Sequence, residues 1–278
     1  MNTPRISFIG TGNMSSAIVQ GLLRAGYPSA QLRGTTARAE TAAIATQNLG
    51  IQVDNDHTAA VAAADILILG VKPQKMMPLC NHLGAVVQKH RPLVISLAAG
   101  LLVDTLKQWL GDHNLAVLRC MPNTPVKLGA GVSGFYAPAN ITAAQQQQVD
   151  AIFSLLGTTQ WVQHESELHT MTAIAGSAPA YFYYFTEALA AAAEQLGASS
   201  ATAQTVAVQV ALGAARMMHE GDESPAQLRA RVSSPGGTTV AALAQMAHLD
   251  DLLKQAVQAS HARSIELSNG FPEAHNKS

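Results

Sequence analysis

The sequence has few charged residues and almost no excess of either sign. Its 278 residues include 17 Lys and Arg against 18 Asp and Glu, a formal net charge of −1 at pH 7. Without a basic face, we expect no nucleic acid partner. Charged residues make up only 13% of the chain and apolar residues 48%, which indicates a folded protein with a substantial core rather than a disordered one.

Cysteines and long apolar runs are equally scarce. The two cysteines, Cys80 and Cys120, form no CxxC pair and lie in apolar stretches, so we expect buried thiols rather than a disulfide framework. Gly10 and Gly12 interrupt the first apolar residues, which argues against a secretory signal peptide. Segments such as 59–71 are too short to cross a bilayer, so no membrane association is expected. These absences predict a cytoplasmic protein.

The first part of the chain alternates short apolar runs with helical patterns. Strands are expected at 6–9, 31–34, 66–71, 93–97 and 116–120, with helices at 15–25, 40–49, 73–89 and 104–110. This βαβ rhythm predicts an α/β domain of the Rossmann type, a mainly parallel sheet with helices on both faces.

After residue 165 the strand pattern stops, and we predict an all-helical second domain over 166–278, following a first domain over 1–165. Helices are expected at 167–197, 199–219, 225–232, 239–247 and 250–268. The stretch AVQVALGAARMM at 207–218 is apolar on nearly every side, and a small domain has too little interior to bury such a helix. Part of its surface is therefore expected to lie between subunits.

A glycine pattern opens the chain. FIGTGNM at 8–14 places Gly10 and Gly12 directly after an expected strand and ahead of an expected helix. In dinucleotide folds the first glycine permits a tight turn, the second lets a pyrophosphate approach the backbone, and the helix N-terminus supplies unpaired N–H groups. Ser15 stands at the third glycine position, a departure from the strict pattern. Its place on the first strand of a βαβ run favours a dinucleotide site over a simple turn.

The end of the second expected strand indicates which nucleotide is bound. NAD sites usually place an acid there for the ribose diol, but this chain reads RGTTAR at 33–38. Thr35, Thr36 and Arg38 could hold a 2′-phosphate, which guanidinium binds in a fork and a carboxylate would repel. The alternative is a solvated surface loop. We predict NADPH as the cofactor, with NADH as a weaker alternative.

Six short segments together carry a family resemblance. They are FIGTGNM, VKPQ at 71–74, SLAAG at 96–100, RCMPNTP at 119–125, GSAPAY at 176–181 and SSPGGTT at 233–239. The first three are shared with related β-hydroxyacid dehydrogenases, whereas RCMPNTP and SSPGGTT are specific. In these segments, which span nearly the whole chain in order, the sequence resembles the pyrroline-5-carboxylate reductase family.

This resemblance implies an activity, an assembly and a cofactor site. The activity is reduction of Δ1-pyrroline-5-carboxylate to L-proline, the last step of proline biosynthesis. The assembly is a homodimer interlocked through its helical domains, often extended to a ring of dimers, with each site formed by the dinucleotide domain of one subunit and the helices of its partner. The cofactor residues carried over from the motifs are Gly10, Gly12, Asn13, Met14, Thr35, Arg38, His57, Val71, Lys72, Pro73, Ala98, Ala99 and Asn123.

The same resemblance places the substrate carboxylate at SSPGGTT. Ser234, Thr238 and Thr239 would hold it with their hydroxyls, and Gly237 with its backbone N–H. The residues alone leave an alternative open, a helix start with Ser and Thr caps. Two departures from the family pattern are Ala178, where GSGPAY is usual, and His57, where an asparagine that touches the adenosine ribose is common.

The implied chemistry needs little acid–base machinery, because a protonated imine is already electrophilic and the protein has mainly to align two rings. Thr172 is the candidate proton donor, and no metal site is expected, since the histidines show no HxH or HExxH spacing. A 3-hydroxyacid dehydrogenase would need a base, typically a lysine on the first long helix of the second domain, and 176–219 contains none. The remaining alternative is a non-catalytic NADPH sensor.

Overall fold

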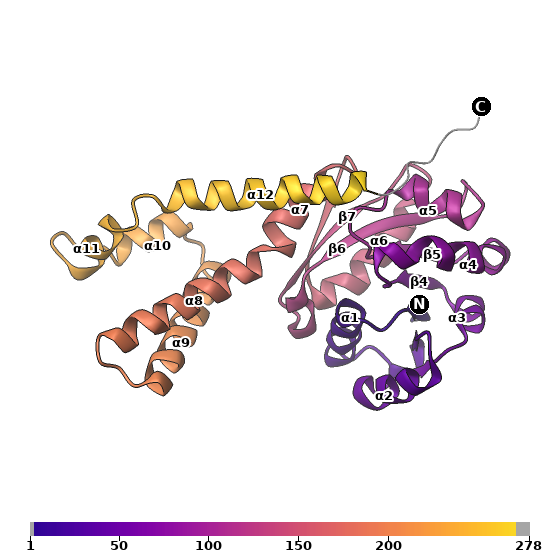
Figure 1. The fold of residues 1–278 in the computed structure, drawn as a ribbon, viewed down its shortest axis with the longest axis horizontal. Helices are drawn as coiled ribbons and strands as arrows, with labels where there is room; N and C mark the ends of the chain where they lie inside the picture. The colour runs from indigo at the N-terminus through magenta and orange to yellow at the C-terminus, as the bar shows by residue number, and fades with distance from the viewer. Residues whose placement is uncertain (1–2, 271–278) are drawn as a thin grey trace. The chain divides into compact units, whose positions relative to one another are not determined.

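The structure, a computed structural model, describes residues 3–270 and contains two compact units (Figure 1). Unit 1 comprises residues 3–176 together with 260–270, and unit 2 comprises Ser177–Ala259. The expected boundary between 165 and 166 remains a prediction.

Unit 1 is built on one eight-stranded sheet. The strands are β1 (Ile6–Ile9), β2 (Leu32–Thr35), β3 (Gln52–Asp54), β4 (Ile66–Leu69), β5 (Leu93–Ser96), β6 (Val117–Pro122), β7 (Gly131–Tyr136) and β8 (Gly157–Val162). Their order is β3-β2-β1-β4-β5-β6-β7-β8, and the pairs are parallel except β6–β7, which is antiparallel. This mainly parallel sheet confirms the expected fold class.

Alternate residues of the central strands enter cores on opposite faces of the sheet. Ile6 and Phe8 of β1 join the core formed with α1 (Asn13–Arg24), α2 (Ala39–Leu49) and α6 (Ala143–Phe153). Ile9 joins the core formed with α3 (His57–Ala63), α4 (Met76–His90) and α5 (Val103–Leu110). Because strand side chains alternate with a period of two, each apolar strand is buried on both sides.

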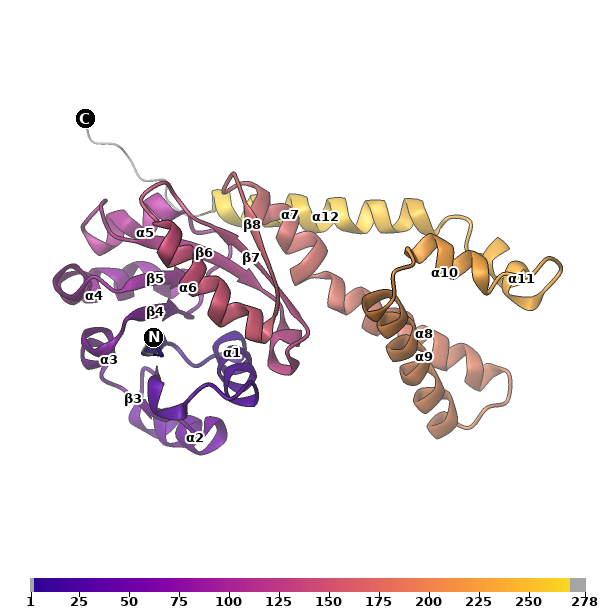
Figure 2. The same ribbon diagram turned by 180° about the vertical axis from the view of Figure 1, so that it is seen from behind.

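Unit 2 is helical, as expected. It contains α8 (Ala178–Gln195), α9 (Ser200–Glu220), α10 (Pro225–Arg231), α11 (Thr238–Ala244) and the first part of α12 (Leu249–Asn269) (Figure 2). The α8–α9 pair packs through the buried alanines Ala190, Ala203 and Ala207. Most larger apolar side chains of these helices stay exposed, for example Phe182 at 67% and Val208 at 60%.

The helical stretch expected over 167–197 is interrupted. A short helix, α7 (Glu167–Met171), leads into a π-helical segment, Thr172–Gly176, before α8 begins. Ala178 is the first residue of α8 and does not have a positive φ, so the alanine causes no backbone strain there. Across residues 3–270, no helix is long and apolar enough to span a membrane.

Candidate active site

The glycine turn lies at the carboxyl end of β1. Gly10 has φ +93°, and its N–H donates to the Thr35 carbonyl oxygen at 3.0 Å. A Cβ at this position would lie 2.8 Å from Cγ1 of Val71. Glycine is therefore required here both by the backbone angle and by the neighbouring loop.

Gly12 has a different reason to be glycine. It is the N-cap of α1 with φ −71°, and a Cβ there would meet no atom closer than the Gly70 carbonyl oxygen at 3.9 Å. The protein itself therefore has room for a side chain at this position. The first-turn N–H groups of α1, beginning with Asn13 and Met14, have no side-chain cap and no acid beside them. An open approach to uncapped helix amides fits a phosphate.

Ser15, the departure from the glycine pattern, faces Gly70 at the end of β4. A Cβ on Gly70 would collide with Ser15 Oγ, so the small residue that allows close packing of helix and strand lies on the strand. Ser15 Oγ is buried and has no hydrogen-bond partner among the described residues. The close packing that the third glycine of the pattern usually permits is thus provided here by Ser15 on the helix together with Gly70 on the neighbouring strand.

A cleft of about 530 Å³ runs beside the glycine turn. Its lining contains no acidic residue among those described, and the side chains of Arg38 and Lys75 have no ion pair within residues 3–270. The lining residues are Gly10, Thr11, Gly12, Thr36, Ala37, Arg38, Thr41 and Lys75. Gly10, Gly12 and Arg38 were expected here, whereas Thr11, Thr41 and Lys75 were missed by the sequence analysis. A basic residue following an expected strand end was the available signal for Lys75.

The Thr35 side chain is engaged within the protein. Its side chain is fully buried, with Oγ1 3.3 Å from the Phe8 carbonyl oxygen and 2.8 Å from Nδ1 of His57. A hydroxyl without exposed surface has no access to a 2′-phosphate in this conformation. In this conformation Thr35 positions the Gly10 turn through its carbonyl oxygen and the His57 ring through its hydroxyl, and a contact of Thr35 with the cofactor stays a prediction. Burial, together with His82, lowers the pKa of His57 against the opposing effects of Asp54 and Asp56.

The remaining expected cofactor residues follow the neighbouring strands but do not line the cleft. Val71, Lys72 and Pro73 come after β4, with Lys72 exposed. Ala98 and Ala99 come after β5, and the Ala98 N–H donates to Ser96 Oγ at 3.3 Å. Parallel strands bring these segments to one sheet edge, where open α/β sheets bind their ligands.

The Asn123 side chain is also engaged within the protein. Its Nδ2 donates to the Ala175 carbonyl oxygen at 3.1 Å, and its Oδ1 accepts the Val132 N–H at 2.8 Å. The side chain is buried and joins the end of β6 to β7 and to the π-helical segment. Asn123 thus supports this corner of the sheet through both ends of its amide, and its contact with a cofactor stays a prediction. The Thr172 hydroxyl, in the same segment, donates to the Leu168 carbonyl oxygen at 2.8 Å.

The 233–239 loop belongs to unit 2 and begins α11. Gly236 has φ +73°, and the Gly237 N–H donates to the Ser234 carbonyl oxygen at 2.9 Å, which closes a tight turn. Gly237 is the N-cap, and no side chain caps the helix. The hydroxyls of Ser234, Thr238 and Thr239 therefore do not act as helix caps here, contrary to the alternative left open by the sequence.

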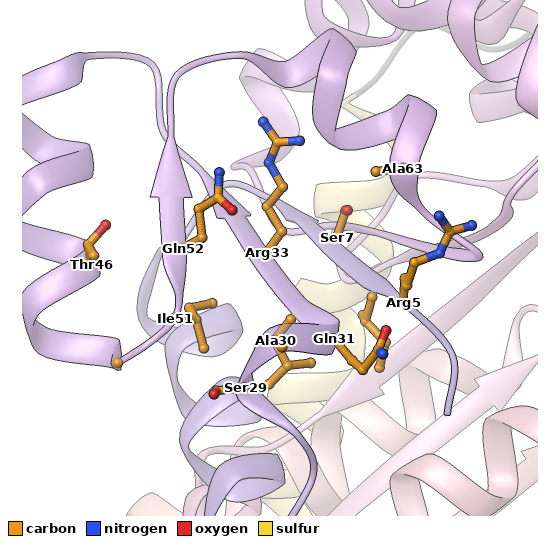
Figure 3. A pocket seen from close by; sticks show the side chains of 13 residues that line it. Arg5, Ser7, Ser29, Ala30, Gln31, Arg33, Thr46, Ile51, Gln52 and Ala63 are labelled. Atoms are coloured by element: carbon orange, nitrogen blue, oxygen red, sulfur yellow. The ribbon is translucent and has the colours of Figure 1, made fainter. Parts of the chain in front are cut away.

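The amino edge of the sheet holds a second hollow of about 490 Å³, with different electrostatics (Figure 3). It is lined by residues around the starts of β1, β2 and β3, including Arg5 and Arg33. Arg5 pairs with Asp65 at 2.8 Å and Arg33 with Asp54 at 2.7 Å. Its two arginines are thus already neutralised, in contrast to Arg38 and Lys75 at the carboxyl edge.

Comparison with known proteins gives matches over both units. The family model described as pyrroline-5-carboxylate reductase dimerisation matches residues 165–267, and one described as NADP oxidoreductase, coenzyme F420-dependent, matches residues 5–100. A pyrroline-5-carboxylate reductase of Pseudomonas aeruginosa is 42% identical over 270 residues, which cover 96% of this chain and 98% of the relative. The chain belongs to the pyrroline-5-carboxylate reductase family.

Other pyrroline-5-carboxylate reductases agree in sequence and fold. That of Vibrio alginolyticus is 38% identical over 98% of this chain and 100% of its own length. The structure from Coxiella burnetii matches with a TM-score of 0.89 at 36% identity, covering 96% of this chain and 99% of that one. A Plasmodium falciparum structure with NADP bound shares the fold, with a TM-score of 0.85 at 24% identity over 96% of this chain and 99% of that one. The family expected from the motifs is therefore confirmed.

Proposed function

We propose that this chain reduces Δ1-pyrroline-5-carboxylate to L-proline, with NADPH as the preferred hydride donor and NADH as the weaker one. Family membership over nearly the whole chain carries the proposal. The preference for NADPH is supported by the cleft at Thr36 and Arg38, where no acid is present to bind a ribose diol. No carboxylate is therefore present there to repel a 2′-phosphate, and the Arg38 guanidinium can form an ion pair with that phosphate.

The protein's task in this reaction is to bind and orient. We assign the pyrophosphate to the Gly10–Gly12 turn and the amides that begin α1, and the 2′-phosphate to Thr36 and Arg38. When bound, the reduced nicotinamide would supply a hydride to the carbon of the protonated imine, whose nitrogen thereby becomes the neutral secondary amine of proline and then takes up a proton from water. Alignment of two bound rings supplies much of the rate in such a step.

We assign the substrate carboxylate to the 233–239 loop. Its support is that the hydroxyls of Ser234, Thr238 and Thr239 are not used as caps, and that the tight turn at Gly236 and Gly237 presents them at the start of a helix. Thr172 remains the candidate proton donor, although its hydroxyl must first leave the Leu168 carbonyl oxygen.

The active assembly that we propose is a homodimer formed through the helical unit, with a ring of dimers as the larger assembly. Its support is the match of residues 165–267 to a dimerisation model and the exposed apolar side chains of α8 and α9. Monomeric proteins rarely expose contiguous apolar surface of this kind. We place the protein in the cytoplasm.

The test is steady-state kinetics with NADPH and pyrroline-5-carboxylate, on the wild type and on Thr239→Val. Wild-type protein should oxidise NADPH only when the imine is added. Thr239→Val keeps the side-chain shape but loses a hydrogen bond to a charged group. This loss should lower kcat/KM by an amount that corresponds to about 1.5–3 kcal/mol of lost transition-state stabilisation. NADPH affinity, measured separately by fluorescence, should not change. A variant with normal kcat/KM and only a lower Tm would place the carboxylate elsewhere, and a wild type inactive on the imine would overturn the proposed reaction.

A further inference from the structure

Lys75 lines the same cleft as the glycine turn, on the side away from Arg38. The sheet order β2-β1-β4 puts the end of β1, with Gly10 and Gly12, between the ends of β2 and β4. Arg38 follows β2 and Lys75 follows β4, and both line the cleft. A ligand that lies across the glycine turn therefore meets a cation on each side.

The backbone at Lys75 is held firmly, although its side chain is exposed. The Lys75 N–H donates to the Lys72 carbonyl oxygen at 2.9 Å and closes the short turn Pro73–Lys75. The next residue, Met76, is fully buried at the start of α4. The loop before it is also fixed, since the Gly70 N–H donates to the Ile9 carbonyl oxygen at 2.9 Å. The Lys75 side chain therefore extends from a fixed backbone position beside the glycine turn.

The charges of the cleft leave a role for this lysine. A dinucleotide phosphate carries two negative charges at its pyrophosphate, whereas the glycine turn offers only backbone dipoles. Arg38 is assigned to the 2′-phosphate, on the β2 side where the adenosine ribose binds in such folds. Among the residues that line the cleft, Lys75 is the other full positive charge.

We infer that Lys75 is a pyrophosphate ligand that increases affinity for NADPH and NADH alike, while Arg38, together with Thr36, distinguishes them. Lys72, the lysine expected from the sequence, lies outside the cleft lining. The inference deepens the proposed function and rests on its assignment of the cleft to a nicotinamide dinucleotide. The two roles are separable, because the pyrophosphate is common to both cofactors and the 2′-phosphate belongs to one.

The experiment measures equilibrium binding of NADPH, NADH and ADP, without substrate, to four variants of the full-length protein. Lys75→Gln should weaken all three ligands by a similar factor, about tenfold for one lost charge-assisted hydrogen bond at a partly exposed site. Lys75→Arg should restore most of this affinity. Arg38→Gln should weaken NADPH and leave NADH and ADP nearly unchanged. Lys89→Gln, at the exposed far end of α4, makes the same change in net charge and should bind like the wild type.

Several outcomes would overturn the inference. A loss confined to NADPH in Lys75→Gln would make Lys75 a ligand of the 2′-phosphate, and equal affinities for wild type and Lys75→Gln would leave it without a role. A comparable loss in Lys89→Gln would reduce the effect to net charge. Because binding is measured without the imine, a failure of the proposed reaction would appear in the kinetics and leave these results unchanged. If wild-type protein bound neither dinucleotide, the cleft assignment itself would fall.

Discussion

Nδ1 of His57 lies 2.8 Å from Oγ1 of Thr35, and this hydroxyl also lies 3.3 Å from the carbonyl oxygen of Phe8. A hydroxyl has one proton to donate, and a carbonyl oxygen can only accept. Thr35 therefore donates to Phe8, and the proton between Thr35 and His57 belongs to Nδ1. In the neutral ring Nε2 is then an acceptor, which suits a ribose hydroxyl where the family often has asparagine.

Thr35→Val should test this positioning role. The variant keeps the side-chain shape but leaves the Nδ1–H of His57 without its acceptor, at a cost of about 1–3 kcal/mol in the free energy of unfolding. NADPH and NADH affinities should fall together, because the change loosens the His57 ring and not a phosphate contact. Chemical denaturation and fluorescence titration measure the two effects. A loss for NADPH alone would restore Thr35 as a direct 2′-phosphate ligand.

The two glycines of the turn should respond differently to alanine. Gly10→Ala places a Cβ 2.8 Å from Val71 on a backbone with φ +93°, so the folded protein should be destabilised. Gly12→Ala meets nothing closer than 3.9 Å, so its stability should match the wild type while dinucleotide binding is lost. Thermal unfolding and cofactor titration separate the two. If Gly12→Ala bound NADPH normally, the pyrophosphate would not approach at this point.

Asn123→Ala should destabilise the corner between β6, β7 and the π-helical segment. It leaves the Val132 N–H and the Ala175 carbonyl oxygen without partners, each at a cost of about 1–3 kcal/mol. Hydrogen exchange at Val132 should become faster than in the wild type. Unchanged exchange there, with a specific loss of cofactor affinity, would instead favour the direct cofactor contact expected from the sequence.

The stability of the protein should fall on acidification, in part because of His169. Burial, Arg119 and His261 lower the pKa of His169 from its ordinary value of 6.5, while its Nδ1 lies 2.9 Å from Ser264 Oγ. As the pH falls below about 6.5, the unfolded chain binds the proton first, so stability is lost on acidification. His57 acts in the same direction.

Thermal unfolding between about pH 8 and pH 5.5 measures this slope, a range that spans the ordinary histidine pKa. His169→Gln should flatten the fall in Tm, whereas His90→Gln, at the exposed end of α4, should retain the wild-type dependence. Identical slopes in all three proteins would mean that the folded state does not disfavour the charged form of His169.

Oligomeric state should depend on the exposed apolar face of α8. Phe182 is 67% exposed in the single chain, and Phe182→Glu should prevent a second subunit from covering it. We expect dimers or their multiples for the wild type and monomers for the variant in sedimentation, with activity lost and NADPH binding retained. Gln147→Glu on α6 of unit 1 is the matched control. A monomeric and fully active variant would contradict the proposed dimer.

Local patterns in the sequence predicted the parts of the fold and site that depend on neighbours in the chain. Gly10 and Gly12 follow a buried strand. The apolar runs of β1, β4 and β5 are typical of strands buried on both faces of a parallel sheet. β3, β7 and β8 were not predicted. β8 alternates in exposure and lacks a compact apolar run, so its pairing with β7 is decided by tertiary packing.

Two of the expected cofactor residues make long-range contacts within the protein that the sequence alone does not indicate. Thr35 forms a hydrogen bond with His57, 22 residues away, and Asn123 forms one with Ala175, 52 residues away. A motif states which residue types are present but not which distant groups will satisfy them. Lys75 was missed because its place in the cleft depends on the order of the strands, which puts it opposite Arg38. The local sequence does not show this order.

Helix α12 ends in unit 1 although it starts in unit 2. Within its last turns, Ser264 meets His169, and Ser268 Oγ donates to the Gly100 carbonyl oxygen at 3.0 Å. These contacts join residues separated by 95 and 168 positions. During translation the sheet unit therefore cannot complete its contacts until almost the whole chain has left the ribosome. Contacts of such long range slow folding, so an unfinished sheet unit would be the species most in need of a chaperone.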